Sequence, residues 1–166
     1  KHLVRLATMV VCPDRHAQRW LGAFGISSHI VSDFVPAARL GMGPVSELQP
    51  RILASGPIAK RSDLGGLMRA FDLVKQKYPR AELTIVGDGL TVEQIAARNG
   101  NGQWSGVTIR RGASGRELEQ LLADCDLYVC SATEAIRPVG LLRAMGAGRP
   151  VISTELGSIR TLVKPD

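Results

Sequence analysis

CDLYVCSATEAIRPVGLLRAMGAGRPVI, residues 125–152, is the stretch that decides the expected fold of this chain. A short apolar run is followed by a polar turn that carries Glu134, then by an amphipathic helical segment and a second apolar run. This order predicts a strand, a helix and a further strand, in other words a βαβ unit. The turn between the first strand and the helix is a natural place for a polar ligand, because the first amides of a helix point outward without partners.

The same alternation begins at Arg51 and predicts a Rossmann-like α/β fold. Helices that join successive strands make right-handed crossovers, which give a parallel sheet covered by helices on both faces. Ser114 and Glu117 have the spacing of a capping box, which marks one helix start. The expected strands are residues 52–55, 82–86, 107–110, 127–130 and 151–153, and the expected helices are residues 63–78, 91–99, 114–124 and 139–145. Ligands bind beyond the carboxyl ends of the strands in such sheets.

The first fifty residues have a different organisation. Two short strands are expected at residues 8–12 and 29–32, with a helix at 14–24 between them, and we expect this fragment to be too short for a sheet of its own. Residues 33–50 contain three prolines and two glycines without periodicity, which is typical of a linker. The expected organisation is the tail of an N-terminal domain at 1–32, a linker at 33–50, and a nucleotide-sugar-binding domain, truncated at its C-terminus, at 51–166.

Composition narrows the classes of function. The net charge of +6 suits a phosphorylated ligand, but no basic run is long enough for a polyanion patch, and aromatic residues make up only 4% of the chain. We therefore expect no nucleic-acid partner. Three cysteines without a CxxC pair indicate buried thiols in a reducing compartment, and three scattered histidines predict no metal site. No apolar stretch reaches the roughly 20 residues of a membrane span, so the cytoplasm is the expected location.

Two glycine-containing turns follow the first two strands of the expected sheet. GPIAKRS, residues 56–62, lacks the spacing of a P-loop or of a dinucleotide site, but Lys60 and Arg61 can hold a diphosphate. The alternative is that these two cations are solvated residues at a helix start. The turn Gly87-Asp88-Gly89 either lets the backbone approach a ligand or makes a sharp corner.

SATEAIRP, residues 131–138, is the turn with the most polar side chains. A carboxylate at Glu134 can accept hydrogen bonds from sugar hydroxyls, and the amides that follow can receive phosphate oxygens. The alternative is a capped helix start in which Thr133 or Glu134 serves only the backbone. Arg143, within the following helix, faces either solvent or the cleft.

Taken together, the segments resemble the retaining glycosyltransferases of family 4, which have the two-domain GT-B fold. Their C-terminal domain has a strand ending in G-R, a nearby K-G, a strand ending in G-D-G or G-x-G, a V-x-F-x-G strand, an apolar strand ending in P-S, and E-G-F-G-x-x-x-x-E-A-M-A-x-G-x-P-V-I. This chain has ILASGPIAKRSDL, AELTIVGDG, VTIRRGAS, ELEQLLADCDLYVCSATE and RAMGAGRPVISTELGS in the same order. RLATMVVCPD through HIVSDFVP resembles the end of the family's N-terminal domain.

The resemblance implies a domain that binds a nucleotide-diphosphate sugar as donor substrate, without a cofactor or metal, while the acceptor binds a missing N-terminal domain. The acceptor is then a glycan or a lipid-linked molecule, reached in the cytoplasm or at the inner face of the membrane. Glu134 matches the glutamate that binds the sugar, and Arg143 falls at a second glutamate that contacts the ribose. The candidate catalytic residues are Glu134, Lys60 and Arg61, and the candidate donor-binding residues are Gly56, Gly87, Asp88, Gly89, Ser131, Thr133, Ala135, Ile136, Arg137 and Arg143.

The chain departs from the family pattern at three places. Pro57 stands where an arginine is common, residues 135–137 replace G-F-G, and Arg143 has no acceptor for a ribose hydroxyl proton. Either Arg137 or Arg143 serves phosphate instead, or the site is degenerate and the chain is a non-catalytic interaction or regulatory module. A nucleotide-binding oxidoreductase is disfavoured, because GxGxxG followed by an acidic residue is missing.

Overall fold

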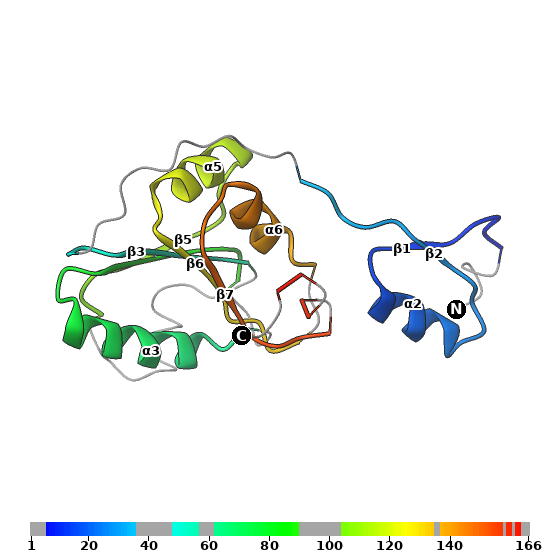
Figure 1. Ribbon diagram of the computed structural model, residues 1–166, viewed down its shortest axis with the longest axis horizontal. Coiled ribbons are helices and arrows are strands. Elements are labelled where there is room, and N and C mark those ends of the chain that lie inside the picture. Colours follow the sequence, from blue (N-terminus) through cyan, green and yellow to red (C-terminus); the bar gives the residue numbers. More distant parts are fainter. Residues whose placement is uncertain are drawn as a thin grey trace.

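Five parallel strands form the main sheet of the computed structural model, in the order β5-β4-β3-β6-β7 (Figure 1). The structure describes residues 6–35, 48–56, 62–89, 104–134, 137–157, 159–160 and 162–163. The strands are β3 (Arg51–Ser55), β4 (Glu82–Val86), β5 (Val107–Arg110), β6 (Leu127–Cys130) and β7 (Val151–Ser153). All five were expected from the sequence and are confirmed. The predicted helix at 91–99 and most of the predicted linker lie outside the described residues.

Helices cover both faces of this sheet, as predicted. The helix α3 (Leu64–Lys77) lies on one face, while α5 (Gly115–Asp124) and α6 (Val139–Gly146) lie on the other (Figure 1). Successive side chains of a strand point to opposite faces, so Ile52 and Ala54 of β3 belong to the core beneath α3 and Leu53 belongs to the core beneath α5 and α6. The two cores together make the sheet a continuous apolar layer.

Side-chain caps hold two of these helices in place, and the cap at Ser114 was predicted. Asp63 accepts a hydrogen bond from the Gly66 amide at 2.7 Å and so caps α3. Ser114 and Glu117 form the full capping box at the start of α5, with distances of 3.3 Å and 2.7 Å. Each cap satisfies amides that the first turn of a helix would otherwise leave without partners.

An ion pair with a buried carboxylate joins the amino-terminal ends of β3 and β6. The Asp126 side chain is 5% exposed and accepts hydrogen bonds from the Arg51 amide at 2.8 Å and from two nitrogens of the Arg51 guanidinium at 3.3 Å and 3.1 Å. The carboxylate raises the pKa of Arg51 through these hydrogen bonds. A buried carboxylate is tolerated here because the charge and its hydrogen bonds are satisfied together.

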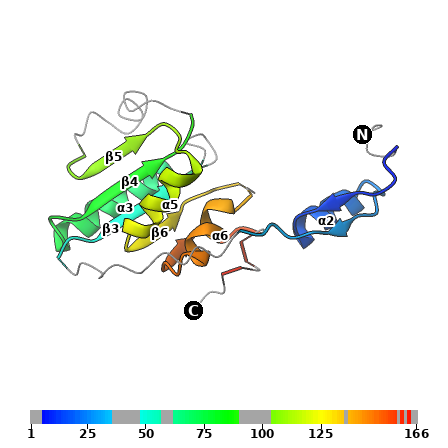
Figure 2. The same cartoon turned by 90° about the horizontal axis from the view of Figure 1, so that it is seen from above.

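The N-terminal segment corrects one expectation. Strands β1 (Val11–Cys12) and β2 (His29–Ile30) pair in parallel as a separate two-stranded sheet, with α2 (Arg15–Gly22) between them in the chain. The prediction that this fragment forms no sheet of its own was wrong, because the backbone pairing continues on both sides: the His29 amide donates to Val10 at 2.9 Å and the Val31 amide donates to Cys12 at 2.8 Å. Figures 1 and 2 show this unit to one side of the main sheet.

The three cysteines are buried and free, as expected. Burial raises the pKa of the Cys125 thiol to about 11 and also raises the pKa of Cys130, so both packing thiols are neutral at ordinary pH. Within the described parts of the chain, no helix has the length and apolar character that crossing a bilayer requires.

Candidate functional site

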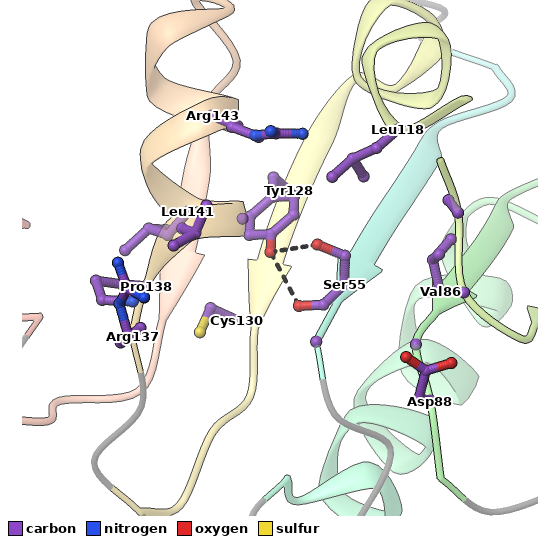
Figure 3. A pocket seen from close by; sticks show the side chains of 16 residues that line it. Ser55, Val86, Asp88, Leu118, Tyr128, Cys130, Arg137, Pro138, Leu141 and Arg143 are labelled. Carbon is purple, nitrogen blue, oxygen red and sulfur yellow. Dashed lines mark hydrogen bonds between the residues drawn. The ribbon is translucent and has the colours of Figure 1, made fainter. Parts of the chain in front are cut away.

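A cavity of about 420 Å³ lies at the carboxyl ends of β3, β4 and β6 (Figure 3). The chain leaves β3 for β4 on one side of the sheet and leaves β6 for β7 on the other. The strand order therefore reverses between β3 and β6, which is the position where open α/β sheets bind ligands. The start of α6 and the turn after β5 complete the wall.

Two hydroxyl groups form the floor of the cavity. Tyr128 of β6 is 1% exposed, and its hydroxyl lies 2.9 Å from the Ser55 hydroxyl and donates to the Ser55 carbonyl at 3.1 Å (Figure 3). Burial raises the pKa of Tyr128 to about 12, although the hydrogen bond with Ser55 lowers it in part. The floor is therefore neutral and polar between two strands that are otherwise apolar.

Helix α6 approaches this floor through Gly140. A Cβ atom at this position would overlap the Tyr128 hydroxyl and lie 2.6 Å from the Ser55 hydroxyl oxygen. Real Cβ atoms essentially never come this close to a neighbour. The absence of a side chain at Gly140 therefore sets how closely the first turn of α6 sits on the strand ends.

Glycine turns form the rim on the side of β4 and β5. The Gly56 amide donates to Val86 at 3.0 Å, the Gly87 amide to Arg110 at 3.1 Å, and the Gly112 amide to Gly87 at 3.3 Å. Gly56 has φ of 147° and Gly112 has φ of 61°, which are values that residues with a side chain rarely adopt. The rim is backbone, so a ligand can approach it closely.

Three charged side chains line the cavity. Arg143 of α6 lies over the Tyr128 ring and reaches toward Leu118 of α5, while Asp88 lies across the cavity from Arg137 (Figure 3). In the described part of the chain, Arg143 is half-buried and its guanidinium has no ion pair or hydrogen bond, whereas Arg137 is paired with Asp33. Two cations and one carboxylate favour a ligand that is anionic or rich in acceptor oxygens.

The structure brings together five of the nine predicted site residues that it describes. Gly56, Gly87, Asp88, Arg137 and Arg143 line the cavity. Gly89, Ser131, Thr133 and Glu134 are described but are not lining residues. Lys60, Arg61, Ala135 and Ile136 lie outside the described residues. The functional roles given to all of these residues stay predictions.

The N-cap residue of α6 is neither Thr133 nor Glu134. Helix α6 begins at Val139, with Pro138 at the N-cap and no side-chain hydrogen bond to the cap. Ser131 instead contributes its backbone to another helix start, since its carbonyl accepts from the Asp63 amide at 2.8 Å.

Sequence reasoning missed Ser55, Tyr128 and Gly140 as parts of the site. The sequence pattern indicated only that Tyr128 belongs to an apolar strand. Its hydroxyl can form a hydrogen bond with Ser55 only because β3 and β6 pair, with Leu53 opposite Tyr128. Gly140 could have been found from the sequence, because it is an isolated glycine in a helical pattern and such glycines often mark close packing. Among the described residues no group of His, Cys, Asp or Glu has an arrangement that holds a metal ion.

Comparison with known proteins gives one family and several structures of the same fold. The family model described as "Glycosyl transferases group 1" matches residues 49–166. Amylovoran biosynthesis glycosyltransferase AmsK of Erwinia amylovora is 26% identical over 121 residues, which cover 69% of this chain and 30% of AmsK. This chain thus spans about a third of the length of that curated relative.

Two solved structures illustrate the likeness in fold. HepE of Anabaena, in complex with UDP and glucose, superposes with a TM-score of 0.72 at 21% identity, over 97% of this chain and 48% of HepE. Sucrose-phosphate synthase from Thermosynechococcus elongatus has a TM-score of 0.76 at 16% identity, over 99% of this chain and 45% of the synthase. At these identities the structures confirm the Rossmann-like α/β fold.

Proposed function

The chain belongs to the glycosyl transferases group 1 family, and from this premise we propose that it is the donor-binding part of a glycosyltransferase. The donor is a nucleotide-diphosphate sugar, and the sugar is transferred with retention of configuration. The observation that carries the proposal is the cavity at the reversal of strand order, with a glycine rim on one side and two arginines at the other.

The cavity fits the parts of such a donor. The glycine turns at Gly87 and Gly112 leave room for a nucleoside to lie against backbone. Arg137, just before α6, presents a planar guanidinium that can bind two phosphate oxygens at once. Lys60 and Arg61, which follow β3 in the chain, are proposed to add to this charge.

Catalysis on this proposal is mainly electrostatic. When the bond between sugar and diphosphate breaks, negative charge grows on the leaving diphosphate, and cations and helix-start amides held in position stabilise it. Glu134, in the turn between β6 and α6, is proposed to accept hydrogen bonds from the sugar. No cofactor or metal ion is proposed.

Arg143 is proposed to contact the nucleoside. It lies one helical turn beyond Val139, deeper between α5 and α6 than Arg137 (Figure 3). A guanidinium only donates hydrogen bonds, so its partners are acceptors such as ribose or base oxygens. This differs from a carboxylate at the same position, which would accept from ribose hydroxyls.

The partners of the complete protein are proposed from the relatives. The HepE structure is a complex with UDP and glucose, so UDP is the first nucleotide to test. AmsK is an amylovoran biosynthesis glycosyltransferase, and a glycan or lipid-linked molecule is the proposed acceptor. We propose that an N-terminal GT-B domain binds this acceptor, in the cytoplasm or at the inner face of the membrane, and that nucleic acid is not a partner.

Calorimetry of the chain with UDP, GDP and ADP tests donor binding. We expect one of the three to bind, and Arg143→Gln to weaken that binding about tenfold or more through loss of a charged hydrogen bond. Arg116→Gln is the matched control, because Arg116 is exposed on α5 and does not line the cavity. Failure of all three nucleotides to bind would count heavily against the proposal.

A second candidate function is a non-catalytic interaction or regulatory module. It is favoured by Arg143, which stands where the family pattern has a carboxylate, and by residues 135–137, which replace G-F-G. Transferase output of the complete protein discriminates the two functions. If neither Glu134→Ala nor Arg143→Glu changes that output, the module is favoured.

A further inference from the structure

An ion pair ties the donor cavity to the segment that follows β2. Arg137 Nε donates to Asp33 Oδ2 at 3.3 Å, and Arg137 Nη2 contacts Asp33 Oδ1, so the pair is bidentate. The two residues are 104 positions apart. Asp33 lies before residues 49–166, the part of the chain that the family model matches.

The pair lies between two cavities that share a wall. The second cavity, of about 230 Å³, is bounded by the N-terminal unit and by α6, and Asp33 is one of its lining residues. Pro138 lines both cavities, and Arg137 lines the first. The guanidinium of Arg137 therefore has the donor cavity on one side and the carboxylate of Asp33 on the other.

The Asp33 carboxylate occupies hydrogen-bonding positions that a diphosphate would use. A guanidinium binds carboxylate and phosphate oxygens with the same planar edges, through two parallel N–H groups. Asp33 also places a negative charge beside the cavity, where it opposes the approach of an anion. Arg137 cannot give the same two donors to both partners.

The exposure of the two side chains shows that Arg137 is the partner that can move. The Arg137 side chain is 71% exposed and the Asp33 side chain 17%. An ion pair whose arginine is exposed contributes little to stability, because water screens the guanidinium and the arginine loses conformational freedom. A ligand with two phosphate groups can therefore draw the exposed Arg137 guanidinium away from the Asp33 carboxylate at small cost.

We propose that Asp33 is the resting partner of Arg137, and that Arg137 exchanges the Asp33 carboxylate for the diphosphate of the donor. Asp33 is then a positioning residue that acts on the donor site through Arg137. The inference rests on the proposed function, since it takes the ligand of the cavity to be a nucleotide diphosphate. Because coupling between two binding equilibria is reciprocal, donor binding releases Asp33, and removal of the Asp33 charge strengthens donor binding.

The test is a double-mutant cycle on the full chain, with UDP as probe and calorimetry as readout. Asp33→Asn is expected to raise UDP affinity about two- to fivefold, the range set by an exposed ion pair. Arg137→Gln is expected to lower the affinity. In the Arg137→Gln background, Asp33→Asn is expected to raise the affinity clearly less than in the wild type, because only the repulsion between the Asp33 charge and the anion is then removed. Asp72→Asn is the charge-matched control, because Asp72 is exposed on α3, and it is expected to leave the affinity unchanged.

A second measurement needs no variant. The side-chain ¹⁵Nε resonance of Arg137 in the wild-type chain is expected to shift when UDP is added, and to shift in the same direction with inorganic diphosphate. Circular dichroism of the Asp33→Asn variant checks that the fold is intact. If that variant is unfolded, the resonance alone decides.

The outcomes separate the inference from the proposed function. If UDP binds but Asp33→Asn leaves its affinity unchanged or weakens it, or if the Arg137 resonance does not move, the exchange is wrong while the donor site stands. If UDP, GDP and ADP all fail to bind the wild-type chain, both the donor site and the exchange are overturned.

Discussion

Substitution of Gly140 by alanine tests whether the close approach of α6 builds the cavity at the carboxyl ends of β3, β4 and β6. The added methyl group would overlap the Tyr128 hydroxyl and come within 2.6 Å of the Ser55 hydroxyl oxygen. Tyr128 is 1% exposed and cannot move aside without disturbing the core, so the overlap is a case of overpacking, which costs about 1–3 kcal/mol. Alanine recovers up to about 1 kcal/mol of helix propensity. We expect a net loss of about 1–2 kcal/mol.

Urea unfolding followed by circular dichroism measures this loss. Gly115→Ala is the matched control, because Gly115 is also near a helix start but has no atom within 4 Å of a built Cβ. It is expected to leave the free energy of unfolding unchanged or to raise it by up to about 1 kcal/mol. Gly140→Ala is also expected to weaken UDP binding, because α6 carries Arg143 into the cavity.

Removal of the Tyr128 hydroxyl should relieve part of the overlap. In a Tyr128→Phe background, the cost of Gly140→Ala is expected to fall, although the Ser55 hydroxyl must still rotate away. The packing argument is refuted if Gly140→Ala is as stable as the wild type. It is also refuted if its cost is the same with and without the Tyr128 hydroxyl.

Two further predictions concern stability. The pKa of Tyr128 is about 12 in the folded chain and about 10 when unfolded. The contribution of this pKa difference to the free energy of unfolding is present below pH 10 and is lost as the pH rises through 12. The Tyr128→Phe variant has no hydroxyl to titrate, so its free energy of unfolding should fall by about 2–3 kcal/mol less than that of the wild type between pH 9 and pH 12. Urea unfolding at the two pH values measures both losses. Asp126→Asn should cost about 1.5–3 kcal/mol in urea unfolding, because it removes the charged partner of Arg51. Asp124→Asn, at an exposed position of α5, should cost clearly less; equal costs would contradict the role of this ion pair.

Local patterns in the sequence predicted most of the main sheet. Strand spacing, the capping box at Ser114 and Glu117, and the alternation of strand and helix depend on residues a few positions apart, so they can be read along the chain. The glycine turns at Gly56 and Gly87 could be placed at strand ends for the same reason. Both short strands of the N-terminal segment were expected, but the pairing of β1 with β2 was missed because a local pattern does not show which strands pair.

The sequence by itself determined the fold class, the family resemblance and the edge of the sheet where a ligand should bind. Only the tertiary structure decided which side chains meet there. Tyr128 and Ser55 share a hydrogen bond because β3 and β6 are neighbours in the sheet, although 73 positions separate them in the chain. Asp33 reaches Arg137 across 104 positions. Contacts at such separations depend on the packing of whole elements, and no local pattern of residues encodes them.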